Sequence, residues 1–176
     1  MKKITWILTL ACLFLAAGAY AQKSSLRTFY DKYKDRENVI DIKISGLLVK
    51  VAASFSDDQE ARHILQKISR LRLLNMENDN PVTSQEYKEL TKNIQQESYE
   101  PLMQIRDKDQ KVDFFIREDG DKIEEVLMFI NGPDSFLMLS VQGLFKFSDL
   151  QDLHMDIEGG DQFRKIPRDR KSIPQA

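Results

Sequence analysis

The sequence is poor in residues that enzymes and metal proteins commonly use. Its single cysteine, Cys12, lies in an apolar N-terminal segment, and it has only two histidines and seven glycines. Without that segment the chain contains no thiol, which excludes disulfides, thiol catalysis, thiolate metal sites and covalent haem attachment. The motifs Gly-x-Ser-x-Gly and Ser-x-x-Lys and a glycine-rich phosphate loop are absent. We therefore expect no catalytic residue and no cofactor, and predict that the protein is not an enzyme.

The N-terminal segment has the pattern of a cleaved export signal. Two lysines precede an apolar run, residues 4–17, that is too short to span a bilayer comfortably, and Ala19-Tyr20-Ala21 offers small residues to a signal peptidase. We predict cleavage after Ala21, no transmembrane segment in the mature chain, and a periplasmic or secreted location. A lipoprotein anchored through Cys12 is disfavoured, because Thr9-Leu10-Ala11 matches a lipidation box poorly.

Charge is distributed unevenly along the rest of the chain. Residues 22–161 carry 19 Lys and Arg against 27 Asp and Glu, a net charge of −8, whereas residues 162–176 carry a net charge of +4. An acidic body lacks the clustered basic face that nucleic-acid binding requires, so no nucleic acid is expected as a partner. Residues 162–176 hold two prolines and few apolar groups, which predicts a disordered tail that is dispensable for folding. The cations of this tail are the candidate binding residues, for an envelope protein or an anionic surface: Arg164, Lys165, Arg168, Arg170 and Lys171.

Residues 22–161 are predicted to form a single α+β domain. Apolar spacing, with capping boxes that begin at Ser56, Thr83 and Ser148, predicts helices in this part of the chain. One of them, residues 47–55, is expected to be buried, because Lys50 is its only charged residue. Alternating or apolar runs predict strands at 39–44, 70–76, 102–106, 112–118, 122–130 and 135–142. Strands gathered in a meander favour one mostly antiparallel sheet with helices packed on one face.

Two acidic patterns resemble metal sites but are incomplete. Glu60 and His63 lie three residues apart on a predicted helix, as in di-metal carboxylate bundles, but the sequence has no second pair. Residues 107–118 imitate a calcium loop, yet Val112 stands where that loop requires glycine. No metal site is therefore expected, and residues 107–110 are interpreted as a hairpin turn. The adjacent acids Glu124-Glu125 are interpreted as residues on opposite faces of a strand.

Residues 126–145 are the most apolar stretch after the export signal. Met128, Phe136 and Met138 could line a pocket for a small apolar ligand, because methionine adapts its shape to its surroundings. The other interpretation, which we favour, is a central hairpin buried against helices.

Several segments resemble those of a family of small exported Bacteroidetes proteins known as domain of unknown function 4252. The resemblance is carried by residues 39–53, 70–76 and 135–143, and by the closing run Ser148-Asp149-Leu150-Gln151-Asp152-Leu153. It implies a Gram-negative envelope location, and no catalytic residue carries over from it. We therefore predict a non-catalytic exported envelope protein that binds a partner or acts in envelope signalling or stress. The alternatives are a binder of a small apolar ligand in a pocket lined by the 126–145 hairpin and, less favoured, a metal-free hydrolase.

Overall fold

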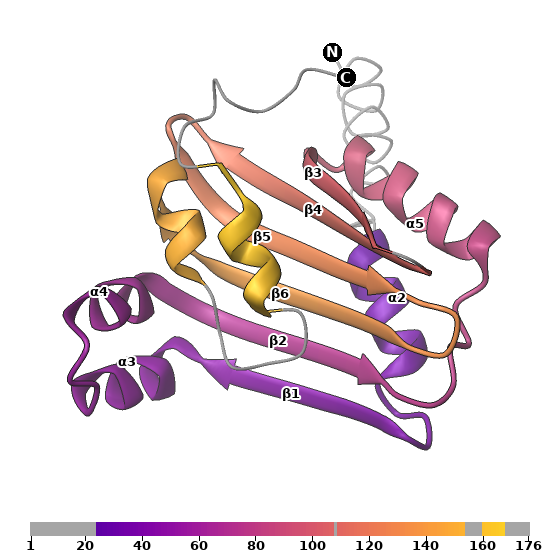
Figure 1. The fold of residues 1–176 in the computed structure, drawn as a ribbon, viewed down its shortest axis with the longest axis horizontal. Helices are drawn as coiled ribbons and strands as arrows, with labels where there is room; N and C mark the ends of the chain where they lie inside the picture. The colour runs from indigo at the N-terminus through magenta and orange to yellow at the C-terminus, as the bar shows by residue number, and fades with distance from the viewer. Residues whose placement is uncertain (1–23, 108, 154–159, 168–176) are drawn as a thin grey trace, which may run out of the picture.

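The protein folds around one six-stranded antiparallel sheet (Figure 1). The computed structural model describes residues 24–107, 109–153 and 160–167. The strands lie in the order β1-β2-β6-β5-β4-β3, so that β3 to β6 form a meander and β2 and β1 extend it beyond β6. Their bounds are β1 (Val39–Ser45), β2 (Ile68–Met76), β3 (Glu100–Asp107), β4 (Gln110–Asp119), β5 (Lys122–Asn131) and β6 (Phe136–Phe145).

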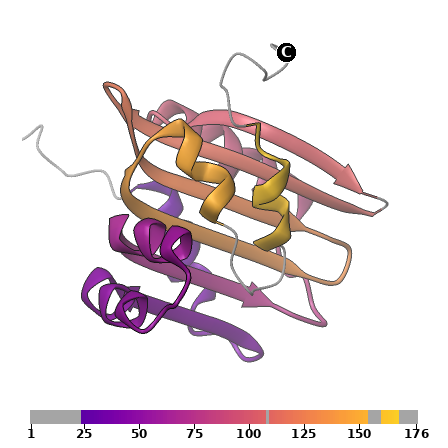
Figure 2. The same ribbon diagram turned by 60° about the vertical axis from the view of Figure 1, so that its left-hand side comes forward.

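Helices cover both faces of this sheet (Figures 1 and 2). One face is covered by α2 (Ser25–Tyr33) and α5 (Ser84–Gln96), the other by α3 (Gly46–Ser54), α4 (Gln59–Lys67), η1 (Phe147–Leu153) and η2 (Gly160–Lys165). Side chains of β5 alternate between the two cores, with Met128 in one and Phe129 in the other. The prediction of a single, mostly antiparallel α+β domain is confirmed. The expectation that the helices pack on one face is wrong, because the central strands are apolar on both sides.

Local signals in the sequence set several boundaries. The side chain of Thr83 accepts a hydrogen bond from the backbone N–H of Glu86 at 3.2 Å, as a capping box requires. Helix α4 is capped by Asp58 instead of the expected Ser56. The side chain of Asp58 accepts a hydrogen bond from the backbone N–H of Ala61. Gly120, in the tight turn between β4 and β5, has a positive φ of 62°, which glycine adopts without strain. Residues 107 and 110 pair across a hairpin, which confirms that interpretation of the calcium-like stretch.

Helix α3 forms where it is predicted but is not buried. Val49 and Ala53 face the core, whereas Leu47, Leu48 and Phe55 are 74%, 60% and 82% exposed. The helix lies at a corner of the sheet and packs against α4 and the start of β2 (Figure 1), so only one of its sides is covered. Apolar residues all round a helix usually indicate burial on all sides, and here the outer side stays in contact with solvent.

The hairpin of residues 126–145 is the centre of the fold. Met128, Phe136 and Met138 are fully buried and pack among core side chains. None of the three lines the cavity that lies between α2 and the sheet. Their positions fit the core interpretation of this stretch.

The C-terminal segment contributes to the core as far as residue 167. Phe163 of η2 and Ile166 are fully buried, and the ring of Phe163 packs edge-on against Phe114 of β4 at 5.1 Å. The side-chain amide of Gln151 in η1 also donates to the backbone carbonyl of Ile166. The expectation of a disordered tail is therefore wrong for residues 162–167, and residues 168–176 lie outside the described residues. In the parts of the chain that the structure describes, no helix is both long and apolar enough to cross a membrane.

Two truncations test this boundary. Ending the chain after Asp161 removes Phe163 and Ile166, and a lost buried phenylalanine alone costs about 3–5 kcal/mol. We expect the melting temperature to fall by roughly 6–20 °C, given about 2–4 °C per kcal/mol for a domain of this size. Ending the chain after Pro167 is the matched control and should leave the melting temperature unchanged. Equal melting of both truncated proteins and the full chain would show that η2 does not stabilise the domain.

Candidate functional site

Each tyrosine among the described residues donates its hydroxyl to a carboxylate. All four lie in the core between the sheet and helices α2 and α5. The acceptor differs in each case, and it belongs to a different element from the tyrosine. The pairs are Tyr30 with Asp41, Tyr33 with Glu86 at 2.7 Å, Tyr87 with Asp113, and Tyr99 with Glu125 at 2.7 Å.

A cation completes each of these pairs. The Nζ of Lys43, Lys32 and Lys111 lies 3.0, 2.7 and 2.9 Å from the carboxylate of its pair, and Arg117 lies 3.2 Å from Glu125. The same cation stands over the face of the tyrosine ring, 4.9–5.2 Å from its centre. We call each set a tyrosine–carboxylate–cation unit. It combines a charge-assisted hydrogen bond with a cation–π contact, and each strengthens as water is excluded.

Strand geometry explains how the sequence builds these units. Asp41 and Lys43 are two apart on β1, and so are Lys111 and Asp113 on β4, so each pair shares one face of the sheet. A carboxylate and a cation in alternate positions of a strand were visible in the sequence. The sequence did not show which tyrosine each pair would contact, because that depends on how α2 and α5 pack.

Burial controls the acidity of the four tyrosines. Desolvation raises the pKa of Tyr30, Tyr33, Tyr87 and Tyr99, and the carboxylate beside each hydroxyl raises it further. The increase is largest for Tyr87 and Tyr99. These hydroxyls therefore act as hydrogen-bond donors and not as bases.

Glu125 is the most buried of the carboxylates in these units. Glu125 is 1% exposed and accepts hydrogen bonds from Tyr99 and from Ser140, each at 2.7 Å. The pairing of β4 with β5 shifts here, since Arg117 pairs with Glu125 and the next paired positions skip Glu124. This bulge lets Arg117 contact both acids, at 3.4 and 3.2 Å. Glu125 faces the side of the sheet that α2 covers and Glu124 the side of α3 and α4, so their expected placement on opposite faces is confirmed.

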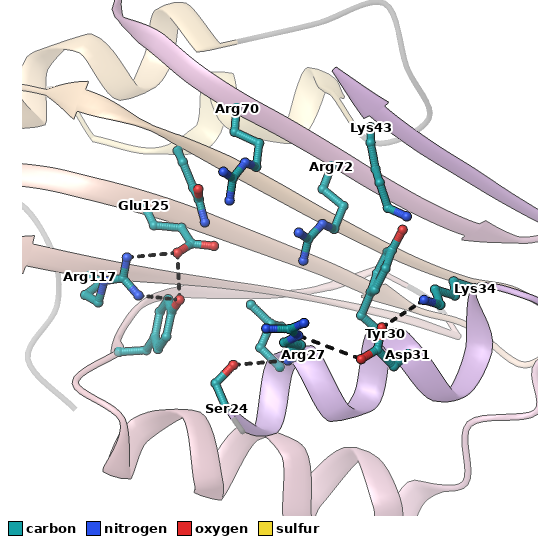
Figure 3. Close-up of a pocket in the computed structure, with 13 residues that line it drawn as sticks. Ser24, Arg27, Tyr30, Asp31, Lys34, Lys43, Arg70, Arg72, Arg117 and Glu125 are labelled. Atoms are coloured by element: carbon teal, nitrogen blue, oxygen red, sulfur yellow. Dashed lines mark hydrogen bonds and ion pairs between the residues drawn. The ribbon is translucent and has the colours of Figure 1, made fainter. Parts of the chain in front are cut away.

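A cavity of about 490 Å³ lies between α2 and the sheet (Figure 3). Its lining is strongly cationic, with two acids, Asp31 and Glu125, on its walls. The cations come from α2 and the turn after it, and from β1, β2 and β4. They are Arg27, Lys34, Lys43, Arg70, Arg72 and Arg117.

Two of these cations have no carboxylate partner among the described residues. Arg27 and Lys34 both reach Asp31, at 3.8 and 3.1 Å, and Lys43 and Arg117 belong to the units described above. Arg70 and Arg72 alternate along β2 and point into the cavity (Figure 3). The guanidinium of Arg72 stacks 4.5 Å from the centre of the Tyr30 ring, and its Nε is buried without a hydrogen bond.

The predicted binding residues are elsewhere. Arg164 and Lys165 are exposed at the end of η2, which covers the opposite face of the sheet from the cavity. Arg168, Arg170 and Lys171 lie outside the described residues. Sequence reasoning missed Arg70 and Arg72, although their alternation around Leu71 was a signal that both face the same side of a strand.

One acid of the calcium-like stretch has another role. Asp113, from the calcium-like stretch, lies in β4 and is bonded by Tyr87, by Lys111 and by the amide of Gln104 at 2.6 Å. Within the described ranges, no group of three or more His, Cys, Asp or Glu side chains is placed to hold a metal ion.

Alkaline titration tests the tyrosine units. Folding raises the pKa of the four tyrosine hydroxyls, so their protonated form stabilises the folded protein. This contribution is fully present below the ordinary tyrosine pKa of 10.0 and is lost as the pH rises above it. Tyrosinate absorbance should therefore stay low above that pH in the folded protein and appear together with unfolding. Tyr87→Phe should lower stability at neutral pH and make it less sensitive to alkali. Ordinary titration near pH 10.0 without unfolding would contradict the buried units.

Comparison with known proteins gives a family but no function. The family model described as Domain of unknown function (DUF4252) matches residues 33–153. No curated protein and no solved structure matches the chain. The matched range contains every strand, helices α3 to α5 and η1, and most of the residues that line the cavity. The chain therefore belongs to the DUF4252 family of domains of unknown function.

Proposed function

We propose that this protein is a non-catalytic binding module of the cell envelope, and that the cavity beneath α2 takes the anionic group of its ligand. The observation that carries the proposal is the pair Arg70 and Arg72. Both arginines point into a cavity with six cations and two acids, and neither has a carboxylate partner among the described residues.

The energetics of this arrangement favour an anion. Like charges gathered in a partly enclosed space repel each other, and the repulsion is relieved when an anion binds among them. A guanidinium offers several N–H donors in a fixed plane, which matches the oxygens of phosphate and carboxylate groups. The buried Nε of Arg72, which has no acceptor, would gain one from such an oxygen.

The lining also indicates a polar ligand and a binding role. The cavity walls are formed mainly by charged and hydrogen-bonding side chains, so they offer little to a small apolar molecule. The acid in the wall that is most buried, Glu125, is occupied by Tyr99, Ser140 and Arg117. A carboxylate held in this way is a poor general base, which supports binding over hydrolysis.

Titration with simple anions tests the proposal. At constant ionic strength, inorganic phosphate, pyrophosphate and citrate should each be tried as probes, and at least one should raise the melting temperature and show saturable binding by calorimetry. Arg72→Gln should weaken that binding by roughly 10- to 100-fold, the equivalent of about 1.5–3 kcal/mol for a lost charge-assisted hydrogen bond. Arg70→Gln should weaken it similarly.

The control is Arg106→Gln, which removes an exposed arginine from β3, outside the cavity. It should leave the affinity unchanged. Absence of saturable binding for all three anions, or equal losses in Arg106→Gln and Arg72→Gln, would refute an anion site in this cavity.

The envelope location rests on the N-terminal signal pattern. We infer that cleavage after Ala21 releases a periplasmic or secreted protein, in which the anion site serves a signalling, stress or partner-binding role. Intact mass of the protein from fractionated cells decides this point. A chain that begins at Gln22 in the periplasm or medium supports export, and a chain that retains Met1–Ala21 in the cytoplasm contradicts it.

A further inference from the structure

The two edges of the sheet differ in how they are protected. Strand β3 carries Pro101, and its pairing with β4 shifts between Pro101 and Met103, which are two common ways to prevent edge pairing. Strand β1 has neither. Its seven residues pair with β2 without a shift, and among the described residues no strand lies on its other side. The backbone N–H and C=O groups on that side are free to pair with another strand.

The open strand also exposes apolar side chains. Ile40 is 47% and Ile42 is 38% exposed, on the face of the sheet that Ile44 shares with the core. Helix α3 begins directly after Ser45 and adds the exposed Leu47 and Leu48 at the same end of the strand. Exposed apolar side chains along an open edge strand are typical of an interaction surface.

We propose that β1 is the dimer interface of this protein, and that a second copy of the chain pairs with it in antiparallel orientation about a two-fold axis at Ile42. This register places Asp41 opposite the partner's Lys43, and Lys43 opposite the partner's Asp41. Ile42 then meets the partner's Ile42, and Ile44 meets the partner's Ile40. The sheet becomes continuous across the two copies.

Charge complementarity selects this register and this occupant. An axis at Asp41 would place two aspartates directly opposite each other, and an axis at Lys43 would place two lysines opposite each other, both of which are destabilising. A slip of one residue would turn the isoleucines of one copy to the wrong face. Of the axes at residues 41, 42 and 43, only the one at Ile42 therefore pairs opposite charges.

The tyrosine unit of β1 prepares the charged pair. Asp41 is held by the hydroxyl of Tyr30 and lies 3.0 Å from Lys43, whose side chain is half exposed. The position of Asp41 is therefore fixed before the second copy binds, which lowers the entropic cost of pairing. Since both copies use the same strand and the β3 edge is blocked, the assembly closes at two copies instead of growing into a filament.

Charge reversal tests the interface by analytical ultracentrifugation. The exported chain, at high micromolar concentration and without an anionic ligand, should have twice the mass of one copy. Lys43→Asp places Asp41 opposite an aspartate of the second copy and should give single copies. Asp41→Lys places Lys43 opposite a lysine of the second copy and should also give single copies. When these two variants are mixed, each reversed charge meets its opposite, and a mixed dimer should form.

The matched control reverses an exposed charge on the other edge strand. Arg106→Glu on β3 should leave the mass of the dimer unchanged. Thermal melting of Lys43→Asp, which keeps the bond from Tyr30 to Asp41, shows whether the single copies are folded. A wild-type chain that stays single at the highest concentration, a Lys43→Asp variant that still doubles its mass, or a mixture that does not associate would each overturn the proposal. Mass is read without ligand, so these outcomes are independent of anion binding.

Discussion

The interaction on which one whole face of this molecule depends is a tyrosine hydroxyl donated to a carboxylate that also binds a cation. A buried carboxylate such as Glu125 or Asp113 is costly unless its charge is paired and its oxygens are hydrogen-bonded. The tyrosine supplies the hydrogen bond, its ring supplies the apolar contact, and the cation supplies the charge. Three such units hold helices α2 and α5 and the residue before β3 against the sheet, and the fourth, Tyr33 with Glu86, joins α2 to α5.

The same units explain why the cavity is cationic. Asp41 and Glu125 are occupied within their units and Asp31 by Arg27 and Lys34, so these acids do not neutralise Arg70 and Arg72. The two arginines stay charged because a guanidinium does not lose its proton in a protein. Positive charge therefore accumulates beneath α2, in a chain whose body is acidic, and the proposed anion site is a consequence of how this face is packed.

The sequence predicted local structure well and the environment of that structure less well. Alternation in Val39–Ile44, the cap at Thr83 and the hairpin turn at residues 107–110 depend on neighbouring residues alone, and these features formed as expected. The apolar sequence of α3 predicted a buried helix, but it could not show that no other element covers the outer side of this helix. Phe163 reaches the core only because η2 folds back onto β4. The convergence of Arg70, Arg72 and α2 depends on the order of the strands, which the sequence does not encode locally.

A double-mutant cycle on Tyr99 and Glu125 tests the central claim, that tyrosine–carboxylate–cation units hold this face together. Free energies of unfolding would be measured for the wild type, Tyr99→Phe, Glu125→Gln and the double variant. The bond of 2.7 Å between these side chains predicts that the two single losses do not add, with a coupling free energy of about 1–3 kcal/mol. Losses that add, with a coupling energy near zero, would show that the units do not stabilise the fold.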